Sequence, residues 1–270
     1  MKTKSLIIVL VFSVFWLQAC PFPAAYGATR LDLVVEYGVD NKSEAQARLA
    51  LDTSTNFFQS TYSLGLERDL QIFLVPNQDT YRTALMQHYG LSDSQARNVA
   101  ESTGGFSRGS AGATIVVNMG SLTSGQSQFF CLCHELVHQF QSQESRDRHN
   151  SIRWLSEGVA DVLAAHILDT AGLRKTDYQR YWQEIVKRAP RWPRLEDLHS
   201  YDDWFASMGA NGPSVTYGAS ALAVLTLVRW KGYRPLFAYF NSLKQLSPED
   251  AFVQAFGLTM ADFEKQFTPF

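Results

Sequence analysis

The chain has 270 residues, a hydrophobic content of 46 % and a formal net charge of −2. This composition is typical of a globular protein and excludes a disordered chain. The small negative charge, without a block of like charges, argues against a protein that binds nucleic-acid phosphates.

The chain opens with a segment that is typical of a targeting signal. Lys2 and Lys4 give it a positive start, and the apolar stretch over residues 6–17 carries no charge. Such a stretch is too short to span a bilayer comfortably, but it suits the hydrophobic part of a signal peptide. We therefore expect an exported protein whose mature chain has no transmembrane helix.

Two cleavage sites are compatible with this segment. Small residues at Ala25 and Gly27 predict a signal peptide over residues 1–27. The letters LQAC that end at Cys20 instead resemble a lipobox, which predicts a lipoprotein signal over residues 1–19 and a lipid anchor on Cys20. The signal peptide over residues 1–27 predicts a secreted or periplasmic protein. The lipoprotein signal over residues 1–19 predicts a protein that is anchored to the membrane by its lipid.

The first half of the mature chain alternates between strand and helix patterns. Short runs of alternating or β-branched apolar residues predict strands at Leu31–Gly38, Leu70–Pro76 and Ala113–Asn118. Apolar residues at helical spacing predict helices at Ser43–Leu64, Asp79–Gly90 and Ser92–Ser102. We expect Ser43 to cap the first of these helices. The glycine-rich segment before the third strand predicts a hairpin.

The second half is almost entirely helical by the same criteria. We expect helices at Ser127–Ser142, Ser151–Thr170, Thr176–Ala189, Val215–Lys231, Arg234–Leu246, Pro248–Phe256 and Met260–Phe267. The irregular stretch Pro190–Ser214 is the longest connection. The sequence thus predicts an α+β fold with a single domain over residues 30–270. A small mixed sheet with helices, about 30–145, precedes a helical part, about 146–270, with a cleft between them.

The stretch Phe129–Gln141, FFCLCHELVHQFQ, carries the first candidate site residues. On a helix, His134 and His138 lie one turn apart on one face, where two imidazoles can hold one metal ion. Glu135 is rotated by about 100° from His134, so it can reach a water at the metal without being a ligand. Taken alone, the stretch is also compatible with a core helix that carries two hydrogen-bonded histidines.

Glu157, in the stretch RWLSEGVAD, favours the metal site. It follows His138 after eighteen residues, which leaves room for a loop and a second helix to cross the metal. Two histidines and one glutamate form a three-ligand zinc site with an open position, which is the catalytic rather than the structural pattern. Asp161 lies on the same helix face as Glu157 and can accept the free N–H of a ligand histidine. Because their neighbours are apolar, unpaired carboxylates at these positions would be costly.

Other reactive side chains are not expected to hold the metal. Cys131 and Cys133 point about 200° apart on a helix, so we do not expect them to pair and interpret them as packing residues. His149 lies in the loop between the two helices, and His166 faces away from Glu157. His199, in the irregular stretch, could reach the cleft.

The motifs HELVH and WLSEGVAD resemble those of the gluzincin metallopeptidases. They are similar to those of zinc aminopeptidases with the pattern W-L-x-E-G-x-A, and the chain as a whole is closer to the smaller peptidase MA-like proteins of bacteria. The likeness extends to the stretches RDLQIFLVPNQDTYRTAL, TYGASALAVLTLVRWKGYRPLFAYF and DAFVQAFGLTMADFEKQF. It covers most of Leu70–Phe270 and implies a zincin-like metallopeptidase domain.

This resemblance implies a role for each matching residue. His134, His138 and Glu157 would hold one Zn²⁺ per chain, and Glu135 would be the general base. The aminopeptidase relatives have a tyrosine that stabilises the oxyanion at the start of a later helix. Tyr217, in the stretch TYGASA, matches that position, although an ordinary core tyrosine is the alternative.

One motif of the aminopeptidases is missing. They carry a G-x-M-E-N stretch whose glutamate binds the free amine of the substrate, whereas the matching region here, GGFSRGSAGATIVVNM, has no acid. The strand Ala113–Asn118 is still able to pair with an extended peptide through its backbone. We therefore expect an exported zinc metallopeptidase that cleaves peptide or protein substrates internally. An aminopeptidase, and a non-catalytic zincin-like binding or structural module, are the alternatives.

Overall fold

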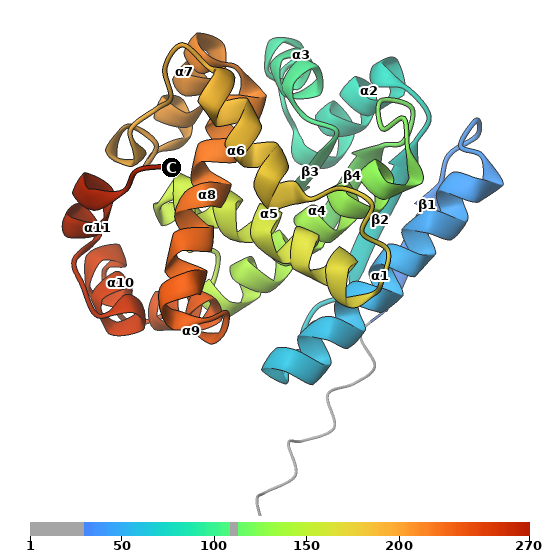
Figure 1. Cartoon of the computed structure of the whole chain (residues 1–270). Helices are drawn as coiled ribbons and strands as arrows, with labels where there is room; N and C mark the ends of the chain where they lie inside the picture. Colours follow the sequence, from blue (N-terminus) through green and yellow to red (C-terminus); the bar gives the residue numbers. More distant parts are fainter. Residues whose placement is uncertain (1–29, 109–112) are drawn as a thin grey trace, which may run out of the picture.

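The computed structural model describes residues 30–108 and 113–270 (Figure 1). Both cleavage sites expected near the N-terminus, including Cys20, lie outside these residues. No helix in the described part of the chain is long and apolar enough to cross a membrane. The described residues form a mixed α+β fold with eleven α-helices and one small sheet.

The sheet has four strands in the order β1-β2-β4-β3. The strands are β1 Leu31–Val35, β2 Leu70–Val75, β3 Gly105–Arg108 and β4 Ala113–Asn118. The first, second and fourth strands are parallel, and β3 runs antiparallel to β4. The small mixed sheet and the hairpin predicted from the sequence are therefore present.

The strand Ala113–Asn118 does not lie at the edge of the sheet, which corrects the expectation that it could pair with a substrate. This strand, β4, is bonded to β2 on one side and to β3 on the other. Its backbone is fully engaged, and its residues are buried. The edge positions belong to β1 and to the short strand β3, which pairs only with β4 among the described strands.

The helices follow the predicted order with two corrections. They are α1 Asn41–Tyr62, α2 Gln78–Tyr89, α3 Asp93–Ser102, α4 Gly125–Ser145, α5 Arg153–Thr170, α6 Tyr178–Arg188, α7 Tyr201–Asn211, α8 Pro213–Lys231, α9 Arg234–Ser242, α10 Pro248–Phe256 and α11 Met260–Gln266. The cap of α1 is Asp40, whose carboxylate accepts from the backbone N–H of Ser43, so Ser43 lies inside the helix. Helix α7 lies within the stretch that was expected to be irregular.

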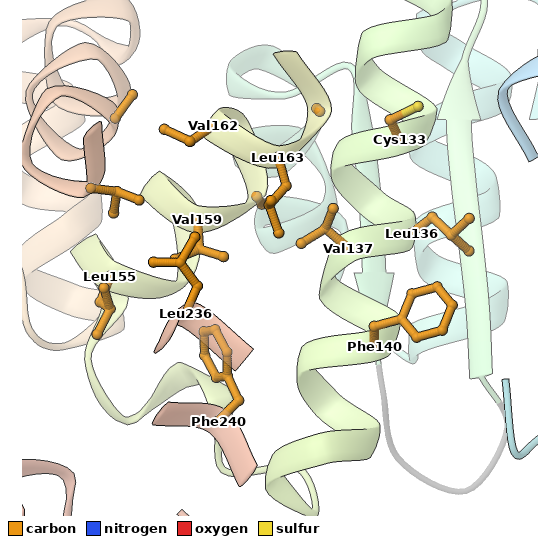
Figure 2. Close-up of a cluster of buried hydrophobic side chains, with 14 of the residues drawn as sticks. Cys133, Leu136, Val137, Phe140, Leu155, Val159, Val162, Leu163, Leu236 and Phe240 are labelled. Atoms are coloured by element: carbon orange, nitrogen blue, oxygen red, sulfur yellow. The ribbon is translucent and has the colours of Figure 1, made fainter. Parts of the chain in front are cut away.

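One large hydrophobic cluster connects the sheet to the helical half. Figure 2 shows the part of it where α4 and α5 meet, with Val137 of α4 facing Leu163 of α5. Phe140 of α4 stacks on Phe58 of α1 with ring centroids 3.9 Å apart. Helix α4 is therefore packed from several sides, which fixes the direction of the side chains that it carries.

Gly158 allows α5 to lie very close to α8. A Cβ atom at this position would lie 2.5 Å from the backbone oxygen of Ser220, closer than any side chain tolerates. This contact fixes the position of α5 at Gly158 and therefore also at Glu157, the residue before it. The large cluster and this close approach hold the two helices that carry the candidate site.

Candidate metal centre

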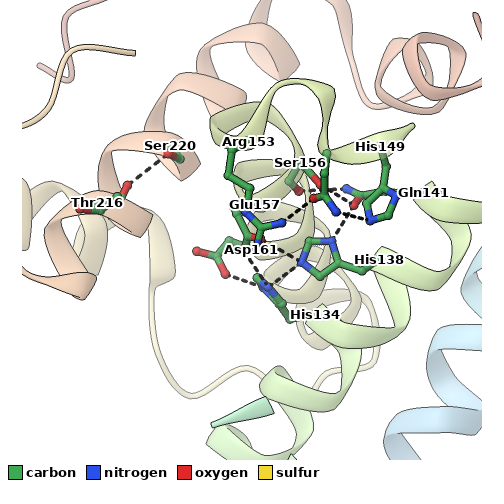
Figure 3. A network of polar contacts seen from close by, with 11 residues as sticks. His134, His138, Gln141, His149, Arg153, Ser156, Glu157, Asp161, Thr216 and Ser220 are labelled. Carbon is green, nitrogen blue, oxygen red and sulfur yellow. Dashed lines mark hydrogen bonds and ion pairs between the residues drawn. The ribbon is translucent and has the colours of Figure 1, made fainter. Parts of the chain in front are cut away.

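Helix α4 supplies three of the predicted site residues. It begins at Ser124, whose hydroxyl accepts from the backbone N–H of Ser127 in a capping box. Two and a half turns further on, His134, Glu135 and His138 are all buried. The Nε2 atoms of His134 and His138 lie 3.1 Å apart, so both rings point to the same place (Figure 3).

Helix α5 brings Glu157 to the same place. Its first backbone N–H groups donate to the carbonyl oxygens of His199 and Leu198 rather than to a side-chain cap. Glu157 Oε2 lies 3.2 Å from His134 Nε2, and Oε1 lies 3.5 Å from His138 Nε2. The three side chains form a buried group whose ligand atoms lie within 4.8 Å of one another.

The other ring nitrogen of each histidine is held by an acceptor. His134 Nδ1 lies 2.8 Å from Asp161 Oδ1, the contact that the sequence predicted. His138 Nδ1 lies 2.7 Å from Gln141 Oε1. The amide of Gln141 is itself oriented, because its nitrogen donates to the carbonyl oxygen of Ser156. Both Nδ1 atoms therefore act as donors, which leaves the Nε2 lone pairs directed toward each other.

This arrangement fits a metal ion with three ligands. A tetrahedral zinc ion with Zn–N distances of about 2.0–2.1 Å separates its ligand atoms by about 3.3 Å. The two Nε2 atoms are 3.1 Å apart, and each has one oxygen of Glu157 at a similar distance, Oε2 at 3.2 Å from His134 and Oε1 at 3.5 Å from His138. Glu157 Oε2 is buried and has no hydrogen-bond partner among the described residues. Facing lone pairs and an orphaned buried oxygen are costly unless a cation lies between them.

The charges around Glu157 keep it ionised. Burial opposes its negative charge, but Arg153, with Nη2 only 2.7 Å from Oε1, and the two histidines outweigh this effect. Together they hold the pKa of Glu157 well below its usual range. The glutamate is thus an anion at neutral pH, as a metal ligand must be.

The carboxylates also determine the charge at His134. Burial lowers the pKa of this imidazole, but the hydrogen bonds and charges of Asp161 and Glu157 raise it well above the ordinary value. Burial raises the pKa of Asp161. The group of side chains therefore favours a positive charge at the point where the Nε2 atoms meet.

Glu135 faces a small cavity beside the metal ligands. The cavity has a volume of about 40 Å³ and is lined by His134, Glu135, His138 and Glu157 on one side. Such a volume is enough for at least one water molecule. Gly105 of β3 covers Glu135 closely, because a Cβ atom there would lie 2.9 Å from Glu135 Oε1. Glu135 is not one of the three clustered ligands, which agrees with its expected position beside the metal.

Tyr217 also lines this cavity. It lies in the first turns of α8, with its ring centroid 6.1 Å from that of His134. Trp204 of α7 packs against it edge to face, with ring centroids 4.9 Å apart. Burial raises the pKa of the Tyr217 phenol well above its ordinary value, so the group is a neutral donor. The structure thus places Tyr217, for which the resemblance implied a role at the oxyanion, in the wall of the small cavity next to His134.

Three residues at the centre were not expected. They are Gln141, which holds His138, Arg153, which holds Glu157, and His149. His149 is buried with its ring centroid 6.1 Å from that of His138, and burial lowers its pKa to about 3. The spacing of Gln141 and Arg153 is compatible with these contacts, since Gln141 lies within one helical turn of His138 and Arg153 within one turn of Glu157.

The remaining reactive side chains lie away from the ligand cluster or only pack beside it. His199 does not enter the cleft, because its Nε2 lies 2.6 Å from Glu264 Oε1 of α11. Cys131 and Cys133 are free and form no disulfide. Cys133 lies 2.9 Å from the hydroxyl of Ser54, and burial raises the pKa of both thiols. The predicted packing role suits both cysteines.

Two larger cavities adjoin the small one on different sides. One, of about 780 Å³, shares Tyr217 with it, and the other, of about 610 Å³, shares Arg153 and Tyr201. The site therefore lies along a longer depression. Its walls come from β3 and α4 on one side and from α5, α7 and α8 on the other, and this is where the cleft between the two parts was expected.

Comparisons of the chain with protein-family models, with curated proteins and with solved structures gave no match. What the protein does is therefore argued from the geometry of this site.

Proposed function

We propose that the protein is a zinc-dependent metallopeptidase with a zincin-like fold and that it cleaves peptide bonds inside a polypeptide. One observation carries the proposal. His134, His138 and Glu157 converge at distances that suit zinc, and Glu135 lines the cavity beside them without being a ligand. Three ligands leave a fourth position open, which is the pattern of hydrolytic rather than structural zinc sites.

The zinc ion, when bound, lowers the pKa of a water molecule toward neutrality and polarises the scissile carbonyl group. Glu135 accepts the proton of the attacking water and donates it to the leaving amine, an effect worth about 10²–10⁴-fold in rate. Tyr217 donates a hydrogen bond to the oxygen on which negative charge develops. Asp161 and Gln141 keep both ligand histidines in the tautomer that binds metal through Nε2.

Internal cleavage is favoured by the edge strand and by the length of the depression. The backbone N–H of Asn118 donates to the oxygen of Gly104, which makes Phe106 and Arg108 the next residues bonded to β4. Gly105 and Ser107 then direct their backbone groups outward, where an extended peptide can pair with them. Cavities on both sides of the metal give room for chain before and after the scissile bond.

An aminopeptidase is the weaker alternative. Strands β3 and β4 carry no acidic side chain, and among the described residues the acids that line the small cavity are Glu135 and Glu157. No further acid of these residues is therefore placed to bind a free amine there. A non-catalytic module would need the metal but not Glu135. We also propose that the chain is exported, on the basis of its first residues, either freely or with a lipid on Cys20.

The substitution Glu135→Gln tests the proposal. We expect the variant to bind zinc like the wild type and to lose cleavage of N-terminally acetylated peptides by at least about 10²-fold. Cleavage is measured by mass spectrometry on a mixed peptide library. Equal cleavage patterns of the two proteins would contradict a catalytic role, and cleavage restricted to peptides with free amines would favour the aminopeptidase.

A further inference from the structure

A large cavity lies next to the candidate metal centre, and most of the residues that line it have no role in the chemistry described so far. It has a volume of about 780 Å³, which is within the usual range of ligand pockets. Its walls come from α4, from α6 with the segment before it, and from the start of α8. The apolar lining consists mainly of Leu122, Phe130, Leu168, Leu173, Tyr178 and Trp182.

The cavity is continuous with the site through side chains that belong to both. Phe130 lies one turn before His134 on α4, with ring centroids 6.5 Å apart. Asp161, which holds His134, lines the cavity, and Tyr217 lines both this cavity and the small one. A peptide whose carbonyl group lies beside Glu135 therefore has a neighbouring side chain within reach of this pocket.

The aromatic wall of the pocket is preorganised. Phe130 and Tyr178 stack with ring centroids 4.6 Å apart, and Trp182 lies next to Tyr178 at 5.8 Å. Gln126 donates to the hydroxyl of Tyr178 over 3.1 Å, which fixes the ring at its polar end. Tyr181 leaves 47 % of its surface exposed at the edge of the same wall. A fixed aromatic surface that remains open to solvent is suited to an apolar side chain.

The two exposed charged side chains that line the pocket are both positive. Lys42 and Lys175 are exposed at its rim, and the one acid in its lining, Asp161, is engaged with His134. Lys42 lies near Asp40, whereas Lys175 has no ion pair with an acid in the described part of the chain. The rim therefore attracts carboxylates and disfavours basic residues next to the bound side chain.

We propose that this cavity is a specificity pocket that holds a large apolar side chain, preferably an aromatic one, of a peptide substrate with acidic neighbours. The inference rests on the proposed peptidase function, since it assigns a substrate class to the same site. The aromatic wall provides affinity through buried apolar area, and Lys175 provides selectivity for charge.

Binding of peptides to the zinc-loaded Glu135→Gln protein tests this without requiring turnover. The probes are acetylated, amidated ten-residue peptides that differ at one position, where Phe, Leu, Ala or Lys is placed. We expect the Phe and Leu peptides to bind at least about tenfold more tightly than the Ala peptide, and the Lys peptide to bind most weakly. Tyr181→Ala should reduce the preference for Phe over Ala to less than about threefold. The matched control is Tyr37→Ala, because Tyr37 is fully exposed and does not line this pocket.

The role of charge is tested with two Phe peptides that carry either Glu or Lys next to the Phe, and with the substitution Lys175→Gln. We expect tighter binding of the Glu peptide than of the Lys peptide. This difference should fall in Lys175→Gln but not in Lys187→Gln, because Lys187 is exposed and does not line the pocket. A further peptide with a free C-terminal carboxylate distinguishes a chain end from an acidic side chain as the anion.

The inference would be overturned by equal affinity for the Phe and Ala peptides, or by no binding of any peptide. It would also be overturned by a preference for Phe over Ala that Tyr181→Ala leaves unchanged. Cleavage by the wild type without side-chain preference would overturn the pocket but not the peptidase. Selective binding without cleavage by the wild type would contradict the peptidase and leave the pocket supported.

Discussion

At the scale of single residues, each side chain of the centre has a different task. His134, His138 and Glu157 converge on one point, while Glu135 faces the cavity beside them. The three ligands depend on partners in turn, because Asp161, Gln141 and Arg153 each hold one of them within hydrogen-bond distance. Such partners orient ligands and raise their affinity for metal.

Gln141 provides a test at this scale. In Gln141→Met, His138 Nδ1 loses its acceptor, and the ring is free to turn or to change its tautomer. We expect the affinity for zinc to fall by about 10–100-fold, measured by competition with a chromogenic chelator. Gln143→Met is the matched control, because Gln143 lies on the same helix and bonds to Gly65 and Glu67 instead. Equal losses in the two variants would contradict a specific role for Gln141.

That His134, His138 and Glu157 lie close together could be predicted from the sequence, because helical spacing and the length of the connecting loop place them. His134 and His138 are one turn apart on any helix, and Glu157 is separated from them by a loop of suitable length. Arg153 and Gln141 were not identified, because a polar residue near a ligand is equally compatible with a solvated helix face. Which loop histidine becomes buried, as His149 does, depends on packing between distant segments and has no local signature.

At the scale of helices and strands, α5 and α8 position the glutamate ligand and the tyrosine. Gly158 allows the two helices to touch, with its Cα facing the backbone of Ser220. Sequence periodicity predicts that both helices exist, but not how closely they approach. The existence of α7 was not predicted. Prolines and glycines near this segment indicated a loop, although Ser200 caps a regular helix there. The bounds of β3 were also not predicted, because a strand as short as β3 has little periodicity of its own.

The substitution Gly158→Ala tests this close approach. The added Cβ atom would lie 2.5 Å from the Ser220 oxygen, and the backbone cannot move away as a flexible side chain would. We expect the free energy of unfolding to fall by about 1–3 kcal/mol, as in other overpacked sites. Gly209→Ala in α7 has no atom within 4 Å and should be neutral or stabilising by up to about 1 kcal/mol. Urea denaturation measures both, and destabilisation of the same size in both would contradict the packing argument.

His199 and Glu264 connect α11 to the segment that precedes α7, and the connection depends on pH. The hydrogen bond that His199 donates to Glu264 raises the pKa of His199. A raised pKa in the folded state means that the ion pair stabilises fully below the ordinary histidine pKa of about 6.5 and is lost as pH rises through the folded value. Trp154 Nε1 donates to the same oxygen of Glu264, and Asp203 and Glu249 add to the negative surroundings.

We therefore expect the wild type to be more stable than His199→Gln at about pH 6, and this difference to shrink toward about pH 9. Urea unfolding of both proteins across this range gives the difference directly. A difference that stays constant or grows with pH would show that the pair does not titrate as described. His88→Gln is the control, because His88 is exposed on α2 and stacks on Phe73 without an acidic partner.

At the scale of the whole molecule, the metal should couple both parts of the chain. The ligands come from α4, which packs on the sheet side, and from α5, which packs on the C-terminal helices. The order of elements and the α+β class followed from the sequence, since long periodic segments define them. A cleft between the two parts was expected, but the cavities along it and their lining residues could not be predicted, because they depend on how side chains from distant elements leave space.

Removal of zinc should lower the stability of the entire fold. A ligand that binds only the folded state stabilises it by RT ln(1 + [L]/Kd), which is about 4 kcal/mol at a thousandfold excess over Kd. For a chain of this size we expect the thermal midpoint to fall by roughly 10 °C when a strong chelator is added. The variant His134→Ala, which cannot hold the metal in the same way, should not respond to the chelator. An equal response of both proteins would place the zinc elsewhere.

The zinc content of the purified protein tests the metal centre most directly. Metal analysis by mass spectrometry should find one zinc ion per wild-type chain after equimolar zinc is added and excess is removed. The double variant His134→Ala, His138→Ala should contain none. A folded wild-type chain without bound zinc, or a double variant that retains it, would contradict the central claim that these residues form a zinc site.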